Sequence, residues 1–583
     1  MSSIAHQERP WTSQRSGASW NAHPLLCLYR TPTRPTRRFL SEILNQEGYV
    51  CVDEMELDAR SDLAEMLNGR ALVFLSAETL TPRECDIIGS WVRGGGSAVL
   101  ICPSAELMQS LGLRFSEAVH HTYHTMPSGY ASLLPTHPWS GDHAGTVVQM
   151  LSPMLLRRLE DERILAMGGL RRDEFSTYPA VIETEAGLGK VVIFWFDPGQ
   201  TVLMLRQGDP RRATNGLLGD PHNPVNYKTG ILFEGVVDCH LHDVPQGDVW
   251  ADLLVSCIRH LTDSALPIPR VWLFPNDAPA LTLLDGDSDA FDWDSYASLA
   301  GPCADRGVPY TLNLIPHHLP NLDRSQIDHW LGRGFDFQLH YWPGNPTPTL
   351  EQEAQAIREH AGLFREKTGL PAVAGRAHSL IWPGYTEMAE ILASNGFRLE
   401  TNFMGFRGWQ YGYLGSARPA RFMRPDGVVI PLTQQPTIFM DDTMQGCKAL
   451  LPPRTPRQAY DLLRLFYNES ANRFHGVICT CLHPGSSLPD NYQNVRCAMR
   501  DAVLDATESL DLPAMTARAW SGFCDARRGL DLRRQANCWR LTAALPIRQG
   551  TLHNPAEAGV RRAGLFWQSC ELNLNQGESM TTG

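Results

Sequence analysis

Three aspartates in the middle of the chain could bind a metal ion or act as a general base. They are Asp285, Asp287 and Asp289, and they come directly after the apolar run 280–284. Carboxylates bind divalent cations, and a carboxylate can also take a proton from an attacking water. In an α/β barrel, catalytic groups project from the C-terminal ends of the strands. The sequence therefore predicts a metal ligand or a general base here.

Other side chains that could bind a metal ion or transfer a proton lie at the ends of the apolar segments that follow in the same region. A carboxylate with two imidazoles is a standard shell for a divalent metal ion, and it leaves a position open for water and substrate. The joint placement of these residues at strand ends is what favours a site. They are His340, Arg376, His378, Asn402 and His483.

The elements that must position these residues alternate regularly between strand and helix. At least six strand–helix repeats imply a parallel barrel, complete or distorted, over residues 271–512. The expected strands are 280–284, 310–315, 335–340, 372–376, 397–402, 428–432 and 477–482, and the expected helices are 293–305, 324–331, 349–368, 386–395 and 456–474.

A separate α/β domain is expected over residues 24–266. Short apolar runs alternate there with a helical pattern, which is typical of a doubly wound, flavodoxin-like parallel sheet. Thr81 is the expected N-cap of the helix 82–92. The expected strands are 25–29, 49–52, 71–75, 98–102 and 189–196.

One segment of this first domain, Ser97 to Gly112, resembles the nucleophile region of class I glutamine amidotransferases. Cys102 falls at the turn from strand to helix. However, Leu100 and Ser104 replace the glycines that relieve crowding at such a turn, and no His-x-Glu pair follows to activate a thiolate. We expect an amidotransferase-like domain without that activity, in which Cys102 is a core residue.

The region 271–512 resembles the polysaccharide deacetylase family, the fourth family of carbohydrate esterases, which shares the NodB homology region. The resemblance rests on four motifs in sequence order. These are Leu281-Thr-Leu-Leu-Asp-Gly-Asp, Gly334-Phe-Asp-Phe-Gln-Leu-His340, the run from Thr368 through Arg376 to Pro383-Gly384, and Val477-Ile-Cys-Thr-Cys-Leu-His483.

Two positions depart from the family pattern. The second metal histidine normally lies four residues after the first, but that position is Gly344, and His378 is the expected replacement. At the first motif, simple register puts Leu284 where the catalytic base belongs. A one-residue insertion would make Asp285 the base and Asp287 the metal ligand.

The resemblance implies metal-assisted amide hydrolysis on a carbohydrate, most simply the removal of an N-acetyl group from a sugar or glycoconjugate. We expect a divalent ion, zinc, as the cofactor. The alternative is an inactive barrel that serves as a carbohydrate-binding or scaffold module. The implied roles are Asp287, His340 and His378 as ligands, Asp285 as base, Arg376 as the residue that orients the base, and His483 as acid, with Asp285 and Asp287 open to exchange.

Several weaker patterns accompany these residues. Trp342, Trp382 and Trp409 lie near expected strand ends and could stack on sugar rings. The second-choice metal site is the segment 238–243, where alternation could put two histidines on one strand face. The histidines in the segment 120–124 are expected to be part of a polar loop.

Composition narrows the class of protein. The formal charge of -12 over 583 residues argues against a nucleic-acid partner. The 14 cysteines form no Cys-x-x-Cys pair, and neither an export signal nor a membrane-spanning run is visible, so we expect a cytoplasmic protein. Residues 1–23 are expected to be disordered, and 513–583 to form a small β-rich extension. A homo-oligomer is compatible with this sequence.

Overall fold

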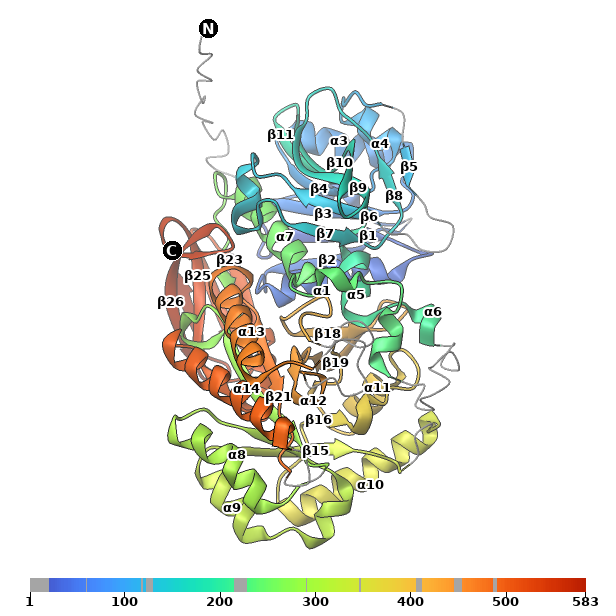
Figure 1. The fold of residues 1–583 in the computed structure, drawn as a ribbon. Helices are drawn as coiled ribbons and strands as arrows, with labels where there is room; N and C mark the ends of the chain where they lie inside the picture. The colour runs from blue at the N-terminus through green and yellow to red at the C-terminus, as the bar shows by residue number, and fades with distance from the viewer. Residues whose placement is uncertain are drawn as a thin grey trace.

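The computed structural model describes residues 20–58, 60–116, 119–121, 129–213, 228–289, 291–344, 348–404, 411–444, 453–485 and 490–582. Two α/β units follow one another along the chain, and Figure 1 shows the N-terminal unit above the barrel. Within the described residues, none of the helices has the length and apolar character that crossing a membrane requires.

The N-terminal unit contains a nine-stranded sheet with a parallel half and an antiparallel half. The members of the parallel half, in spatial order, are β2 (Val52–Glu56), β1 (Leu25–Arg30), β3 (Leu72–Ala77), β4 (Ser97–Ile101) and β11 (Gly189–Phe194). Four strands of the parallel half occur where the sequence predicts them, whereas β2 begins where the expected strand 49–52 ends. The antiparallel half was not predicted, and it consists of β10 (Glu174–Ala186), β9 (Arg163–Arg171), β6 (Gly129–Leu133) and β7 (Val147–Met150).

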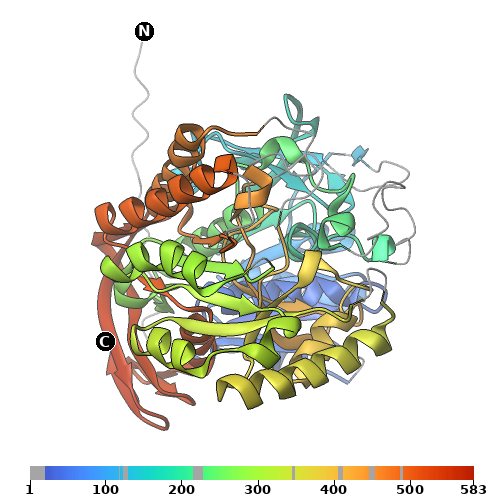
Figure 2. The same cartoon turned by 60° about the horizontal axis from the view of Figure 1, so that its bottom comes forward.

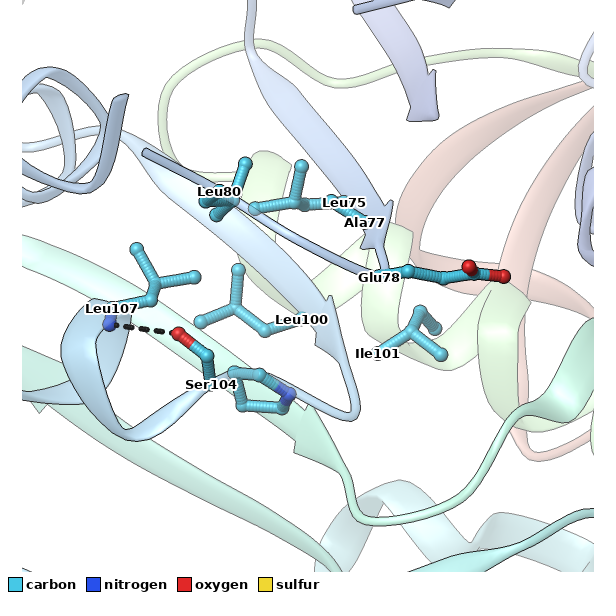
Figure 3. Close-up of a pocket in the computed structure, with 9 residues that line it drawn as sticks. Leu75, Ala77, Glu78, Leu80, Leu100, Ile101, Ser104 and Leu107 are labelled. Carbon is cyan, nitrogen blue, oxygen red and sulfur yellow. Dashed lines mark hydrogen bonds between the residues drawn. The ribbon is translucent and has the colours of Figure 1, made fainter. Parts of the chain in front are cut away.

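A strained turn joins β4 to α4 (Ala105–Ser110). Cys102 has a φ of 48°, a conformation that costs a residue with a Cβ some free energy. Ser104 caps α4 by accepting a hydrogen bond from the Leu107 backbone N–H at 3.2 Å (Figure 3). Burial raises the pKa of the Cys102 thiol to about 12, so the thiol is protonated at neutral pH.

The barrel is built on a ten-stranded sheet that curls around the site. Eight of its strands run parallel in spatial order, β18 (Ala420–Met423) pairs antiparallel with β19, and β22 (Ala514–Met515) pairs with β13. Among the described strands nothing joins β18 to β20, so the barrel is open there. The parallel strands are β19 (Val429–Gln434), β17 (Leu399–Glu400), β16 (Ala374–Ala377), β15 (Asp336–Tyr341), β14 (Thr311–Leu314), β13 (Leu281–Asp287), β21 (Val477–Cys481) and β20 (Phe439–Met440).

Helices cover the outside of this sheet, and Figure 2 shows the green and yellow helices lying along it. Their starts follow ordinary capping chemistry: Thr349 and Thr455 each form a capping box with a glutamine three residues later. The helix α14 was not predicted, and the bounds of the others lie within a few residues of the expected ones. The helices are α8 (Trp293–Asp305), α9 (Arg324–Gly332), α10 (Leu350–Thr368), α11 (Glu387–Ser394), α13 (Pro456–Glu469) and α14 (Asp490–Ser509).

One glycine is required where the first strand of the barrel meets its neighbours. A Cβ at Gly286 would lie 1.7 Å from the Tyr310 hydroxyl oxygen and 1.9 Å from the Leu482 carbonyl oxygen. Those two groups are hydrogen-bonded to each other across β13. Gly286 therefore allows the close approach that sets the register of Asp285 and Asp287.

Buried charges join the N-terminal unit to the barrel. The Arg418 guanidinium, which precedes β18, donates to Asp252 at 2.7 Å and to Glu47 at 3.0 Å. Asp252 lies on α7 (Gln246–Thr262), and Glu47 directly follows α1 (Phe39–Gln46). All three side chains are almost completely buried, and so the two units share a charged, water-excluded interface.

The residues after 513 add a helix and two small sheets. The α15 helix (Ala517–Arg528) packs into the barrel, where the Trp520 indole N–H donates to the Gln435 side chain at 3.0 Å. One sheet contains β23 (Leu530–Gln535), β24 (Cys538–Ala543) and β27 (Ser579–Thr582). The other contains β12 (Arg270–Val271), β25 (Ile547–Arg562) and β26 (Leu565–Leu574).

Candidate active site

The residues predicted from strand ends lie together at the carboxyl edge of the barrel sheet. They come from neighbouring parallel strands, whose ends meet at one edge. Asp285 and Asp287 lie at the end of β13, His340 lies on β15 and Arg376 lies on β16. His483 is the second residue after the end of β21. His378 begins the short helix η8 (His378–Leu380) directly after β16, and Asn402 follows β17.

Two imidazoles and one carboxylate form a group of potential metal ligands. The donor atoms of Asp289, His340 and His378 lie within 4.8 Å of one another. Asp289 Oδ1 is 3.1 Å from His340 Nε2 and 3.8 Å from His378 Nε2. Asp287, by contrast, lies 3.8 Å from the other ring nitrogen of His340. The carboxylate nearest to both imidazoles is therefore Asp289.

The hydrogen bonds of His340 point its Nε2 atom at the candidate site. Its Nδ1–H donates to the Arg376 carbonyl at 3.1 Å, and its Nε2–H donates to Asp289 Oδ1 at 3.1 Å, so a bound cation would take the place of the Nε2 proton. Outer partners of this kind commonly fix the tautomer of a ligating histidine. The donor set thus fits a divalent cation, and because the Asp289 side chain is 40% exposed, water and substrate can reach it.

Arg376 holds two of the three aspartates. Its Nη2 donates to both carboxylate oxygens of Asp285, at 3.1 and 2.9 Å, and its Nη1 donates to Asp287 at 3.1 Å. Asn313 also donates to Asp287, at 2.9 Å. Arg376 is completely buried, and its Nε–H is bonded to the Thr401 carbonyl, so the guanidinium has a fixed orientation.

The environments of the two aspartates shift their pKa values in opposite directions. Burial raises the pKa of Asp285 to about 6, although Arg376 opposes this effect. Burial also acts to raise the pKa of Asp287, but the positive charges of Arg376 and His340 outweigh it, and the net pKa is lowered. Asp287 is therefore the better candidate for a carboxylate that is ionised whenever the site is in use.

His483 is oriented by a carboxylate that the sequence analysis did not identify. Its Nδ1–H donates to Asp441 Oδ1 at 2.6 Å, and its backbone N–H donates to Asp441 Oδ2 at 2.9 Å. The free Nε2 points at the aspartate group, 3.9 Å from Asp287 and 4.0 Å from Asp289. Burial acts to lower the pKa of His483, but the Asp441 carboxylate outweighs it, and the pKa is raised well above its ordinary value.

Asp441 was missed because its strand is too short to show a pattern. It directly follows β20, which spans two residues, and it begins the four-residue helix α12 (Asp441–Met444). A two-residue strand leaves no periodicity to read. The Asp-Asp pair at 441 and 442 after an apolar triplet was the one available signal.

Of the three tryptophans considered as sugar platforms, one lies beside the candidate ligands. The Trp342 ring is half-buried, and its centroid is 4.6 Å from that of His378. Trp382 is buried against Phe403 and Phe422 and belongs to the core. Trp409 lies outside the described residues. Only Trp342 among the described pair is therefore placed to meet a bound substrate.

The second-choice metal site has a different local structure from the expected strand. Its core is the 3-10 helix η5 (Cys239–Leu241), capped by Asp238. Donor atoms of Asp238, Cys239 and His240 lie within 4.8 Å, but the Asp238 carboxylate already accepts hydrogen bonds from Tyr130 and the His240 backbone. In the histidine patch, residues 119–121 form β5, and residue 124 lies outside the described part of the chain.

Comparison with known proteins gives structural neighbours only. No protein-family profile and no curated protein matches the chain. The solved structure of Agd3, a carbohydrate deacetylase, is 10% identical with a TM-score of 0.40, and the alignment covers 96% of this chain and 98% of that one.

Two further neighbours align with part of this chain. A family 4 carbohydrate esterase from Streptomyces lividans is 11% identical with a TM-score of 0.26, and the alignment covers 41% of this chain and 93% of that one. A family 4 acetyl xylan esterase from Clostridium thermocellum is 13% identical with a TM-score of 0.26, covering 41% and 89%. These identities and TM-scores are low, so function is argued from the geometry of the site.

Proposed function

We propose that this protein is a metal-dependent hydrolase that removes an N-acetyl group from a sugar or glycoconjugate. The observation that carries the proposal is the grouping of Asp289, His340 and His378 around one point. Beside it lie an ionised aspartate and a histidine held in its protonated form. Ligands, base and acid for hydrolysis of an amide thus lie together at one edge of the barrel sheet.

In this proposal Asp289, His340 and His378 would hold the metal ion, and zinc suits such a nitrogen and oxygen set. A bound divalent ion would polarise the acetamido carbonyl and lower the pKa of water. Asp289 takes the ligand role that the sequence analysis gave to Asp287, because it lies closer to both imidazoles. Asp287 in turn takes the role of base from Asp285.

The chain's own residues then perform the proton transfers. Asp287 accepts the proton of the attacking water, and Arg376 holds that carboxylate in place. His483 donates its Nε2 proton to the nitrogen of the leaving amine. This transfer is needed because an amine that leaves without a proton is a very poor leaving group. Asp285 fixes the guanidinium of Arg376 through two hydrogen bonds and acts as a positioning residue.

A carbohydrate is the substrate class that the surroundings of the site favour. Trp342 offers a half-buried ring beside His378, and such rings stack on the apolar face of a sugar. The acidic cluster of Asp287, Asp289 and Asp441 also disfavours an anionic group at the reacting position. An uncharged acetamido sugar satisfies both conditions.

Metal content tests the ligand set independently of turnover. The wild-type chain should bind about one divalent ion, and His340→Ala, His378→Ala and Asp289→Asn should each lose it. His329→Ala, an exposed histidine on α9, is the matched control and should retain the ion. Near-normal metal content in all three ligand variants would rule the proposal out.

Acetate release from N-acetylglucosamine oligomers tests the reaction. Asp287→Asn should keep the metal ion and lose acetate release, since Asp287 is assigned as the base and not as a ligand. If Asp287→Asn lost the ion while Asp289→Asn kept it, the two roles assigned here would be wrong.

A further inference from the structure

A second hollow, far along the chain from the candidate ligands, lies where the N-terminal unit meets the barrel. It has a volume of about 270 Å³, which is slightly smaller than typical ligand pockets. Arg34, Thr36, Gln200 and Asp209 line it from the N-terminal unit, and Tyr385 and Pro425 line it from the barrel.

The position of this hollow in the sheet is one where α/β proteins bind ligands. Arg34 and Thr36 follow the carboxyl end of β1, and Gln200 follows the carboxyl end of β11. Open α/β sheets bind small molecules in the crevice outside the carboxyl ends of their strands. An ion pair of 2.9 Å between Arg37 and Asp197 ties the two strand ends together and keeps the crevice in shape.

Two groups that line the hollow lack hydrogen-bond and ion-pair partners among the residues that the structure describes. Among the described residues, no hydrogen bond or ion pair reaches the half-buried Arg34 guanidinium, although its charge acts on the buried Asp197 carboxyl. The Gln200 side-chain oxygen is buried and accepts no hydrogen bond. A buried acceptor without a donor and a cation without an anion both cost free energy, which a ligand could recover.

We propose that this hollow binds a small polyhydroxylated anion, a sugar that carries a carboxylate or a phosphate. The anionic group would pair with Arg34, and a hydroxyl would donate to the Gln200 oxygen. The Tyr385 ring and the side chains of Leu203 and Met204 supply the apolar wall that the body of a sugar needs.

The remaining polar groups in the hollow support this assignment. Asp209 is already paired with Arg211 at 2.7 Å, so its charge does not cancel that of Arg34. A neutral sugar would leave Arg34 unpaired. The neighbouring hollow between β3 and β4 has room for about 10 Å³ only and can hold at most one water, so it is not an alternative site (Figure 3).

Isothermal titration calorimetry of the full chain tests the proposal, with glucuronate, glucose 6-phosphate and glucose as probes. At least one of the two anions should bind with a Kd below about 1 mM, and glucose should bind at least about 10-fold more weakly. The anion that binds tells whether the carboxylate or the phosphate is the recognised group.

Variants separate this site from the proposed active site. Arg34→Gln should weaken binding by about 10- to 100-fold, which is the range for loss of a charged hydrogen bond. Gln200→Leu should weaken it as well. Arg457→Gln, at a side chain 79% exposed on α13, is the matched control. His340→Ala should bind the anion normally, because the two sites share no residue.

Three results would overturn the proposal. The first is that neither anion binds at about 10 mM, well above the expected Kd. The second is that glucose binds as tightly as the better anion. The third is that Arg34→Gln binds like the wild type. Because the Arg34 side chain makes no hydrogen bond within the described chain, unchanged thermal unfolding should show that this variant is folded.

Discussion

The pairing of His483 with Asp441 predicts a specific effect of the substitution Asp441→Asn. The asparagine keeps the shape of the side chain but removes its charge. Asp441 is 3% exposed and accepts two hydrogen bonds from His483, one of them from the ring at 2.6 Å. Since this carboxylate is the main cause of the raised pKa of His483, the pKa should fall in the variant.

The size of the effect follows from the strength of a charged hydrogen bond. Loss of such a bond costs about 1.5–3 kcal/mol, which corresponds to a fall of about one to two units in the pKa of His483. In the proposed mechanism, His483 acts as the acid and is active only when it is protonated. Activity therefore declines as pH rises through the pKa of His483. The alkaline limb of kcat/KM should therefore move to lower pH, and the maximal rate should fall about 10- to 100-fold.

The assay is the pH dependence of acetate release, combined with an NMR titration of His483. Asp442→Asn is the matched control. The Asp442 carboxylate acts on His483 through its charge, but the two side chains are not hydrogen-bonded to each other. That variant should shift the alkaline limb by less. An unchanged limb in Asp441→Asn, or equal shifts in both variants, would refute the role given to Asp441.

Three further predictions concern stability. Burial lowers the pKa of His475 to about 3, so as pH falls below 6.5 the unfolded chain binds a proton before the folded chain does. Each unit by which pH falls between 6.5 and 3 should therefore lower the free energy of unfolding by about 1.4 kcal/mol. In urea titrations, His475→Gln should reduce this loss. Burial raises the pKa of Glu353 to about 8, so this residue lowers the stability of the folded chain as pH rises above 4.5. Glu353→Gln should therefore raise the unfolding temperature at pH 8 and leave it unchanged at pH 4. Gly286→Ala should abolish soluble expression or lower the unfolding temperature by well over about 5 °C, because its Cβ would overlap the Tyr310 hydroxyl.

The barrel could be predicted from the sequence because its local patterns and its packing agree. The helix α8 has the expected bounds, and Asp292 caps it by accepting a hydrogen bond from the Ser295 backbone N–H. The strand ends at His340 and Arg376 lie within a residue of the prediction. The strands β13, β14, β15, β16 and β21 are buried along their whole length, so their apolar runs are continuous and clearly bounded.

The N-terminal unit was predicted less well, and the physical reasons differ along its sheet. The strand β2 begins at Val52 instead of Tyr49, because it is an edge strand in which Glu54 and Glu56 are exposed, while the apolar residues before it are in a turn. The antiparallel half contains long strands such as β10, which alternate between polar and apolar residues and carry no helix between them. A search for strand–helix repeats does not detect such strands.

The roles within the site depended on distances that spacing alone does not give. Asp285 and Asp287 alternate along β13 and therefore share one face, and Asp289 follows the strand by two residues. From the sequence, Asp287 was expected as the ligand and Asp285 as the base, with these two open to exchange, and Asp289 received no separate role. Which of them is nearest to the imidazoles depends on how far β13 extends relative to β15. His378 could be proposed from its position after Arg376, since neighbouring strands deliver their side chains to one edge.

The interface around Arg418 means that the barrel is not a portable module. Excision of the N-terminal unit would remove Asp252 and Glu47 together and leave a guanidinium in an apolar cut surface. An unpaired charge of this kind is far more costly than the pair it replaces. The barrel expressed without the N-terminal unit should therefore be insoluble.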